Sequence, residues 1–176
     1  MTLREFLQLA KDYNISAIGC AAQALLETGF FRSALMVSHR NYWGIKCTKR
    51  WTNAGGTCWS AKTREEYASG DAVIVAGFAH YDTDDEAFTE YEGLIQRLYP
   101  VCRDNPDNVW LYLSGLAGKW ATDRRYLPKL AQIVCVSVAP EMGLSKDDLT
   151  VEYSAALARG LAGEKAAILG EVIRRA

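Results

Sequence analysis

The chain has 176 residues, of which 49% are hydrophobic and 23% are charged, and its formal net charge is −1. This length suits one compact domain, and the composition excludes a disordered chain. The small net charge gives no attraction to nucleic acid or to an anionic membrane surface, and the apolar runs fall short of the ~20 residues that a membrane-spanning helix needs.

The first predicted elements are two helices. A Thr-x-x-Glu capping box at Thr2 starts a helix that we expect to span about residues 2–13. Ser16 can cap a second helix, whose apolar residues recur at helical spacing and which ends near Gly29. Glu27 falls in the last turn of this helix, where the negative end of the helix dipole disfavours a carboxylate.

A small β lobe is predicted next. Residues 41–79 are rich in Gly, Thr and Trp and have no helical period. We place a turn at Gly55-Gly56, flanked by a short hairpin of Lys46–Trp51 and Thr57–Thr63. Residues 73–80 can add another small strand.

The later part of the chain returns to helices, and each has a capping residue or an N-terminal proline as its start signal. The start residues and last apolar residues are Thr83 with Leu98, Pro106 with Leu116, Asp123 with Val134, and Ser145, whose helix Gly160 and Gly163 interrupt. This pattern predicts an α+β protein that is mainly helical and carries a small β-hairpin lobe. We divide it into residues 1–144, the main domain, and residues 145–176, a C-terminal helical extension packed on that domain.

The five cysteines form an odd and scattered set, which argues against a disulfide scaffold. Cys47 and Cys58 flank the predicted hairpin and could pair, whereas synthesis in a reducing cytoplasm would keep them as thiols. A zinc site would need both of them with His39 or His80, and no zinc-like spacing supports that. We therefore expect no metal and no cofactor, and the redox state of the cysteine pair stays open.

Glu27 is the strongest candidate for chemistry. Cleavage of a glycosidic bond needs a carboxylic acid that is still protonated near neutral pH. Burial on an apolar helix and the C-terminal end of the helix dipole both raise the pKa of a carboxyl group. From these residues alone, Glu27 is either such an acid or a partly buried structural glutamate bonded to a neighbour.

Four motifs then shift the balance between these two interpretations. They are Ala22–Gly29 (AQALLETG), Asn41–Lys46 (NYWGIK), Phe78–Tyr81 (FAHY) and Trp120–Asp123 (WATD), the last followed by Tyr126. In these motifs, over roughly residues 15–137, the chain resembles the bacterial peptidoglycan endo-β-N-acetylglucosaminidases of glycoside hydrolase family 73. That family includes autolysin catalytic domains and the wall-cutting domain of flagellar rod-assembly proteins. The resemblance implies a lysozyme-like fold with a groove between the helices and the β lobe, and hydrolysis of the β-1,4 bond between N-acetylglucosamine and N-acetylmuramic acid.

The resemblance also assigns roles to individual residues. Glu27, in the Glu-Thr-Gly motif, is implied to be the general acid. Glu65 matches a second carboxylate that some members carry in a Thr-x-Glu motif, although the adjacent Glu66 makes this choice ambiguous. The second carboxylate would act as the base of an inverting mechanism, unless the N-acetyl group of the substrate assists instead. The residues implied to bind substrate are Asn41, Trp43, Tyr81, Trp120 and Tyr126.

Two departures from the family pattern affect the site. Phe30 and Phe31 stand where members usually carry Trp-Gly, so we expect a bulkier loop after the catalytic helix. Trp120 stands where most members have a tyrosine, and it can stack on a sugar but cannot lend a hydroxyl. A role that needs the phenol would pass to Tyr126.

Other functions on the same groove stay open. A lytic transglycosylase or a muramidase would share the fold and the acid, whereas a catalytically silent wall-binding or assembly protein would use the groove alone. The N-terminus has no secretory signal pattern. We therefore expect synthesis in the cytoplasm and action on the wall after release or delivery, as a phage lysis enzyme, a secreted effector or an autolysin fragment. The expected partner is peptidoglycan, with no nucleic acid and no membrane insertion, and a cognate inhibitor or a delivery machine is a further candidate.

Overall fold

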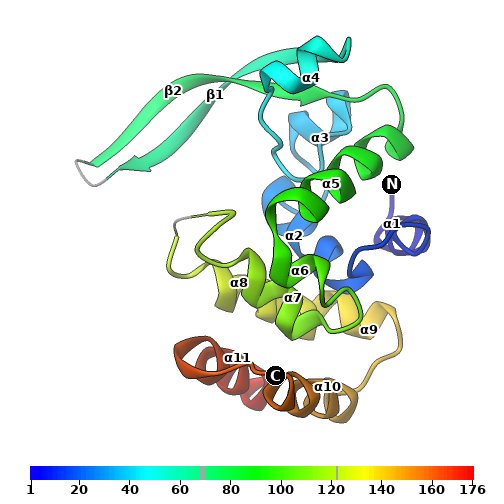
Figure 1. The fold of residues 1–176 in the computed structure, drawn as a ribbon, viewed down its shortest axis with the longest axis vertical. Coiled ribbons are helices and arrows are strands. Elements are labelled where there is room, and N and C mark those ends of the chain that lie inside the picture. Colours follow the sequence, from blue (N-terminus) through cyan, green and yellow to red (C-terminus); the bar gives the residue numbers. More distant parts are fainter. Residues whose placement is uncertain (68–69, 122) are drawn as a thin grey trace.

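The computed structural model describes the backbone of residues 1–67, 70–121 and 123–176, and their side chains except those of residues 63–74. Helices make up most of it, and one long hairpin extends sideways from the upper part (Figure 1). The predicted α+β class, mainly helical with a small β-hairpin lobe, is therefore confirmed. Within the described ranges, no helix is both long and apolar enough to cross a membrane.

The helical elements share a stacked arrangement around a common core. In chain order they are α1 (Leu3–Ala10), α2 (Ala17–Thr28), α3 (Ala34–His39), α4 (Lys49–Asn53), α5 (Asp84–Leu98), α6 (Pro100–Arg103), α7 (Val109–Leu116), α8 (Tyr126–Ile133), the π-helix η1 (Val134–Val138), α9 (Ala139–Glu141), α10 (Lys146–Ala158) and α11 (Gly163–Arg175). The strands are β1 (Thr57–Tyr67) and β2 (Gly70–His80).

Local capping explains why the first two helices begin where they do. Thr2 forms the predicted capping box, and the Ser16 hydroxyl accepts a hydrogen bond from the third residue of α2. Gly29 ends α2 with φ of 58°, a left-handed conformation in which glycine has no Cβ penalty. The expected extension of the first helix to Tyr13 is wrong, because residues 11–13 form turns with hydrogen bonds to the third residue before them.

The predicted hairpin around Gly55-Gly56 is also wrong. Thr48 caps a helical turn, so residues 49–53 form α4 instead of a strand. The two glycines lead into β1, and Gly56 lies so close to the Trp51 ring that a Cβ there would be 2.1 Å from it. The actual hairpin pairs β1 with β2, from Thr57↔His80 to Tyr67↔Gly70, so the strand predicted at residues 73–80 is part of β2.

The base of the hairpin is joined to the preceding segment covalently and by backbone hydrogen bonds. Cys47 and Cys58 form a disulfide, with their Cα atoms 5.8 Å apart. The Cys47 amide donates to the Gly77 carbonyl of β2, and the Ala79 amide donates to the Ile45 carbonyl. Residues 45–47 therefore run beside β2, and the disulfide connects them to β1 as well.

We expect three free thiols out of five when the oxidised protein is unfolded without reductant, those of Cys20, Cys102 and Cys135. The paired cysteines are 11 residues apart, and the chain-entropy model gives such a loop about 3 kcal/mol of stabilisation. Reduction should therefore lower the free energy of unfolding by up to that amount. Thiol titration and urea unfolding with and without reductant check both values, and five thiols before reduction would contradict the pairing.

Two later helix starts differ from the prediction. Asn108, not Pro106, caps α7 by accepting the Leu111 amide, while Pro100 opens α6. Asp123 does not directly cap α8, which begins at Tyr126; its carboxylate accepts the Arg125 amide in the preceding turn. In both places the predicted start lies within a few residues of the actual one, and before α8 the Asp123 side chain stabilises the turn that leads into the helix.

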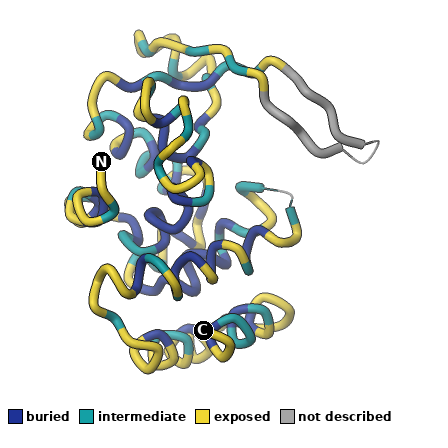
Figure 2. Tube along the Cα trace, turned by 180° about the vertical axis from the view of Figure 1, so that it is seen from behind, coloured by how far each residue is buried: buried dark blue, intermediate teal, exposed yellow. Residues whose placement is uncertain are grey.

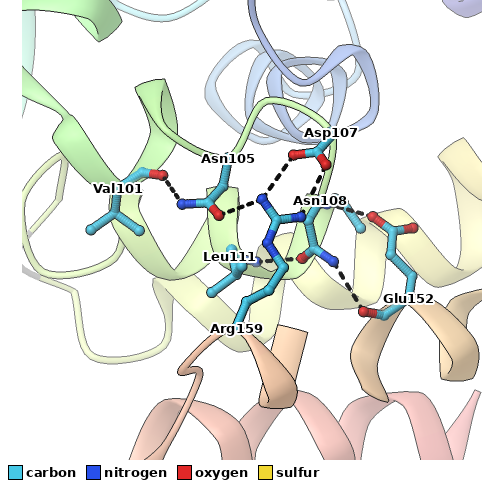
Figure 3. Close-up of polar contacts among 8 residues, drawn as sticks. Val101, Asn105, Asp107, Asn108, Leu111, Glu152 and Arg159 are labelled. Carbon is cyan, nitrogen blue, oxygen red and sulfur yellow. Dashed lines mark hydrogen bonds and ion pairs between the residues drawn. The ribbon is translucent and has the colours of Figure 1, made fainter. Parts of the chain in front are cut away.

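The C-terminal helices α10 and α11 lie across the bottom of the molecule and pack against α7 and α8 (Figure 1). Ser145 caps α10 with a capping box, and Gly160, with φ of 103°, separates the two helices as predicted. Figure 3 shows the polar part of this interface, in which Arg159 donates to both Asp107 oxygens at 3.0 Å and to Asn105 at 2.7 Å. These contacts connect the extension to the loop that precedes α7.

Candidate active site

Glu27 lies at the C-terminal end of α2, one of the most deeply buried helices of the protein. Most of this helix is buried (Figure 2), eight of its twelve residues in all. Glu27 itself is exposed. The next residue, Thr28, is buried and closes the helix, since its hydroxyl donates to the Ala24 carbonyl at 2.6 Å and accepts the Phe31 amide at 2.8 Å. The apolar helix thus holds one exposed carboxyl at its solvent-facing end.

The loop after Glu27 has an unusual backbone. Phe30 and Phe31 have φ values of 61° and 62°, which L-residues with bulky side chains rarely adopt at a cost of roughly 1–2 kcal/mol each. Phe31 packs against Phe6 and Tyr42, at ring-centroid distances of 5.4 and 6.2 Å. This packing offsets part of the strain, while Phe30 stays half exposed and adds the bulk expected beside the acid.

Two opposing effects act on the pKa of Glu27. Enough protein surrounds the carboxyl to raise its pKa by desolvation, although the residue as a whole remains accessible. The Tyr126 hydroxyl donates to Glu27 Oε1 at 2.8 Å, which stabilises the carboxylate and lowers the pKa. Desolvation is the larger effect, so the net pKa lies above the ordinary value for a glutamate.

A chain of buried hydrogen bonds orients Tyr126. Gln23 Nε2 donates to the Tyr126 hydroxyl at 3.1 Å, and the Tyr91 hydroxyl donates to Gln23 Oε1 at 2.6 Å. Tyr91 Oη lies 2.9 Å from Tyr112 Oη, and since the Tyr91 proton goes to Gln23, Tyr112 is the donor of that pair. Every hydrogen bond in this series is therefore donated in the direction of Glu27. All of its members except Glu27 are buried.

Sequence reasoning missed Gln23, Tyr91 and Tyr112. Gln23 gave a usable signal, because it is a polar residue in an apolar helix and lies four residues before Glu27, on the same helix face. The two tyrosines gave none, because their role depends on contacts between α2, α5 and α7.

Asn41 and Trp43 are both fully buried. Asn41 Nδ2 donates to the Ile45 and Ala79 carbonyls, and its Oδ1 accepts the Ile45 amide. Trp43 donates to the Cys20 carbonyl at 3.1 Å and stacks on Tyr91 at 3.9 Å. Neither residue offers a surface to a sugar, so we reassign both from substrate contact to positioning of the segment between α3 and α4.

Tyr81 and Trp120 line a groove of about 550 Å³ between the β lobe and α5. Tyr81 is fully buried, whereas Trp120 is partly exposed and packs on Tyr91 and Tyr99 at 5.8 and 5.6 Å. Glu27 does not line this groove. The groove and Glu27 are nevertheless linked in the sequence, because Trp120 lines the groove and Tyr126, the partner of Glu27, follows six residues later.

Glu65 lies in β1, where its backbone pairs with Ala72 of β2. The side chains of Glu65 and its neighbour Glu66 lie outside the described residues. The hairpin and the loop before α8 project on the same side of the molecule (Figure 1).

The geometry at Glu27 suits proton donation. A carboxyl group with a raised pKa keeps its proton nearer to neutral pH, and an adjacent tyrosine hydroxyl can stabilise the carboxylate that donation leaves behind.

Comparison with known proteins gives a consistent result. The family model described as glucosaminidase, mannosyl-glycoprotein endo-β-N-acetylglucosaminidase, matches residues 3–135. The catalytic domain of the autolysin Auto from Listeria monocytogenes is 27% identical with a TM-score of 0.60, and the match covers 75% of this chain and 77% of that one. A mutant peptidoglycan hydrolase from Sphingomonas sp. A1 is 26% identical with a TM-score of 0.65, over 81% of this chain and 94% of that one.

A third solved structure shares the fold. The glycoside hydrolase domain of FlgJ from Salmonella typhimurium is 22% identical with a TM-score of 0.57, and the match covers 90% of this chain and 99% of that domain. A search of curated proteins by sequence gave no match. The match to FlgJ extends beyond the region of the family model and so includes part of the C-terminal helices.

Proposed function

This chain belongs to the glucosaminidase family, and from that premise we propose that it is a peptidoglycan hydrolase that cleaves the β-1,4 bond between N-acetylglucosamine and N-acetylmuramic acid. The observation that carries this proposal is the geometry at Glu27, an exposed carboxyl that accepts a hydrogen bond from the Tyr126 hydroxyl at 2.8 Å. The listerial and Sphingomonas structures support it, because they are an autolysin domain and a peptidoglycan hydrolase.

In the proposed mechanism, Glu27 gives its proton to the oxygen of the leaving sugar as the glycosidic bond breaks. Desolvation raises the pKa of the carboxyl and so favours its protonated form before the reaction. Tyr126 then donates to the carboxylate that forms, so the negative charge is stabilised when it appears and not before. Gln23 holds the Tyr126 hydroxyl in place for this purpose.

The proposal is tested on purified sacculi. Clearing of the suspension, with new reducing ends at N-acetylglucosamine, is the expected result. Reducing ends at N-acetylmuramic acid would make the protein a muramidase, and anhydro ends would make it a lytic transglycosylase. Binding to sacculi without clearing would leave a wall-binding protein.

The substrate makes peptidoglycan the partner and the cell wall the place of action. Arrival there by release through a membrane or by a delivery machine, and control by a cognate inhibitor, stay predictions. Co-purification of an inhibitor that blocks clearing would support the last of these.

We expect Tyr126→Phe to move the alkaline limb of the pH–kcat/KM profile to higher pH. The lost hydrogen bond stabilised the carboxylate, so its removal raises the pKa of Glu27 and keeps the acid protonated at higher pH. The variant should also lose about 1–3 kcal/mol of stability, because the buried Gln23 amide loses its acceptor. Rates from pH 4 to 9 and urea unfolding measure both effects.

Tyr153→Phe is the matched control. The Tyr153 hydroxyl donates to the Ala166 carbonyl at 2.7 Å, within the pair of C-terminal helices. This variant should lose a comparable hydrogen bond without moving the alkaline limb. If the alkaline limb of the Tyr126→Phe profile stays in place or moves to lower pH, the role assigned to Tyr126 is contradicted.

A further inference from the structure

The groove between the β lobe and α5 carries charges that the proposed mechanism does not use. In the part of the chain that the structure describes, two arginines, Arg50 and Arg97, line it beside a single carboxylate, that of Glu90. The whole chain has a net charge of −1, so this local excess of positive charge is not a consequence of overall composition. An electropositive hollow with an aromatic lining is suited to an anionic group carried on an otherwise neutral ligand.

Glu90 holds two guanidinium groups at the groove. It accepts from Arg50 at 2.7 and 2.6 Å and from Arg97 at 3.5 Å, and its side chain is only 17% exposed. A guanidinium has five N–H donors, so these ion pairs leave donors available on both arginines. The Arg50 and Arg97 side chains are 57% and 42% exposed, and a ligand can therefore reach them.

Tyr81 supplies a second, independent observation. It is fully buried and lines the same groove, and its hydroxyl is the one buried side-chain polar atom without a hydrogen-bond partner in the part of the chain that the structure describes. An unpartnered buried hydroxyl is costly, and an acceptor oxygen from a ligand would remove that cost. Burial and the nearby Glu86 and Glu90 raise the Tyr81 pKa far above its ordinary value, so the hydroxyl keeps its proton and can donate it.

A series of contacts connects the groove with the acid. Trp120 lines the groove and packs on Tyr91 at 5.8 Å, and hydrogen bonds join Tyr91 to Glu27 through Gln23 and Tyr126. A strand whose scissile bond lies at Glu27 can therefore place a substituent of a neighbouring sugar near this groove.

We propose that the groove binds the carboxylate of the peptide attached to the glycan, through Arg97, Arg50 and the Tyr81 hydroxyl, so that the enzyme selects peptide-bearing strands. This inference rests on the proposed function, which supplies the glycan. Two arginines and a neutral hydroxyl donor form a set that suits a carboxylate, whereas a neutral amide or hydroxyl gains little from the guanidinium charges.

The test compares two soluble tetrasaccharides of alternating N-acetylglucosamine and N-acetylmuramic acid. One carries L-Ala-γ-D-Glu with free carboxylates, and the other carries the same dipeptide with carboxamides. We expect kcat/KM to be about tenfold higher for the acid form, mostly through KM, because one charge-assisted hydrogen bond is worth roughly that factor. Arg97→Gln should remove the difference by slowing the acid form alone.

Arg103→Gln is the matched control, because Arg103 is similarly exposed at 45% and pairs with Asp104 outside the groove. It should keep the full preference. Tyr81→Phe should reduce the preference while the melting temperature stays constant or rises, because the hydroxyl makes no bond in the free protein. A fall in melting temperature with unchanged preference would show a structural hydroxyl and remove Tyr81 from the binding role.

The outcomes separate this inference from the proposed function. Equal cleavage of both forms by the wild type would overturn the inference and leave the hydrolase proposal standing. If neither form is cleaved, calorimetric titration with the N-acetylated dipeptide still decides, since binding of the acid and not of the diamide supports the groove assignment. Equal binding of acid and diamide, or no binding of either, would overturn it.

Discussion

Glu27→Gln should lower the rate of peptidoglycan cleavage by about 10²–10⁴-fold, the loss typical of removing a general acid. Glutamine has nearly the same shape, and its Oε1 can still accept the Tyr126 hydroxyl that now lies 2.8 Å from Glu27 Oε1. It has no acidic proton to give to the leaving sugar. Reducing-end release from sacculi measures the loss, and a variant that keeps a tenth of the wild-type rate would remove Glu27 from the acid role.

Glu27→Gln should also change how the stability of the protein depends on pH. Because folding raises the pKa of Glu27, the folded state disfavours the ionised form, and this penalty grows as pH rises above the ordinary glutamate value. Glutamine avoids the penalty. The melting temperature of Glu27→Gln should therefore match the wild type in acid and equal or exceed it at pH values above the raised pKa.

Glu152→Gln is the matched control. Burial also raises the pKa of Glu152, whose carboxylate accepts the Val109 amide at 2.6 Å beneath α7 (Figure 3). It has no part in the proposed mechanism, so its variant should keep the wild-type rate per folded molecule. Equal losses in the two variants would point to a general effect of neutralising buried carboxyls.

Helix starts were predictable wherever one side chain and its own backbone decide the structure. Thr2, Ser16, Thr83 and Ser145 each accept a hydrogen bond from an amide three residues later, and each begins its helix where the sequence indicates. These contacts need no tertiary partner, so the local sequence is sufficient.

The β lobe was harder to predict because its decisive contacts are distant in sequence. Gly55-Gly56 has the composition of a hairpin turn, but Gly56 is needed for close contact with the Trp51 ring of α4. The partner of Thr57 is His80, 23 positions further along, and the disulfide at Cys58 adds a constraint that local pattern cannot show. The strands at residues 57–63 and 73–80 were therefore predictable, whereas the strand predicted at residues 46–51 and the pairing were wrong.

The candidate site divides in the same way. Motif reasoning located Glu27 and Tyr126, and the structure places them in contact. It also selected Trp43, which is buried against Tyr91, because a pattern of aromatic residues does not tell which of them faces solvent. The series of hydrogen bonds from Tyr112 through Gln23 to Tyr126 joins four helices, and only the folded protein assembles it.

A second large loss of activity is expected at Glu65. We propose that this residue is the base of an inverting mechanism, which needs a second carboxyl ~6.5–9.5 Å from the acid with the attacking water between them. Its backbone lies in β1, within a hairpin whose base the Cys47–Cys58 disulfide connects to the segment beside β2. The cleavage rate of Glu65→Gln should then fall by about 10²–10⁴-fold, nearly as far as that of Glu27→Gln.

Glu66→Gln is the matched control for this variant, because it makes the same change one position further along the same strand. It should keep most of the activity. The reverse result, a large loss at Glu66 and a small one at Glu65, would transfer the role of the base to Glu66.

The configuration of the fresh product decides between the base and the substrate's own N-acetyl group. Attack by water from the far side inverts the β bond and gives an α product, whereas attack by the acetamido carbonyl followed by water returns a β product. We expect NMR of the first turnovers to show the α anomer. Replacing the acetamido group of the reacting sugar by a free amine gives an independent check, because it removes the internal nucleophile and leaves the Glu65 route intact. A β product, with a collapse of activity on the amine substrate, would exclude Glu65 as the base and leave Glu27 as the acid of a substrate-assisted reaction.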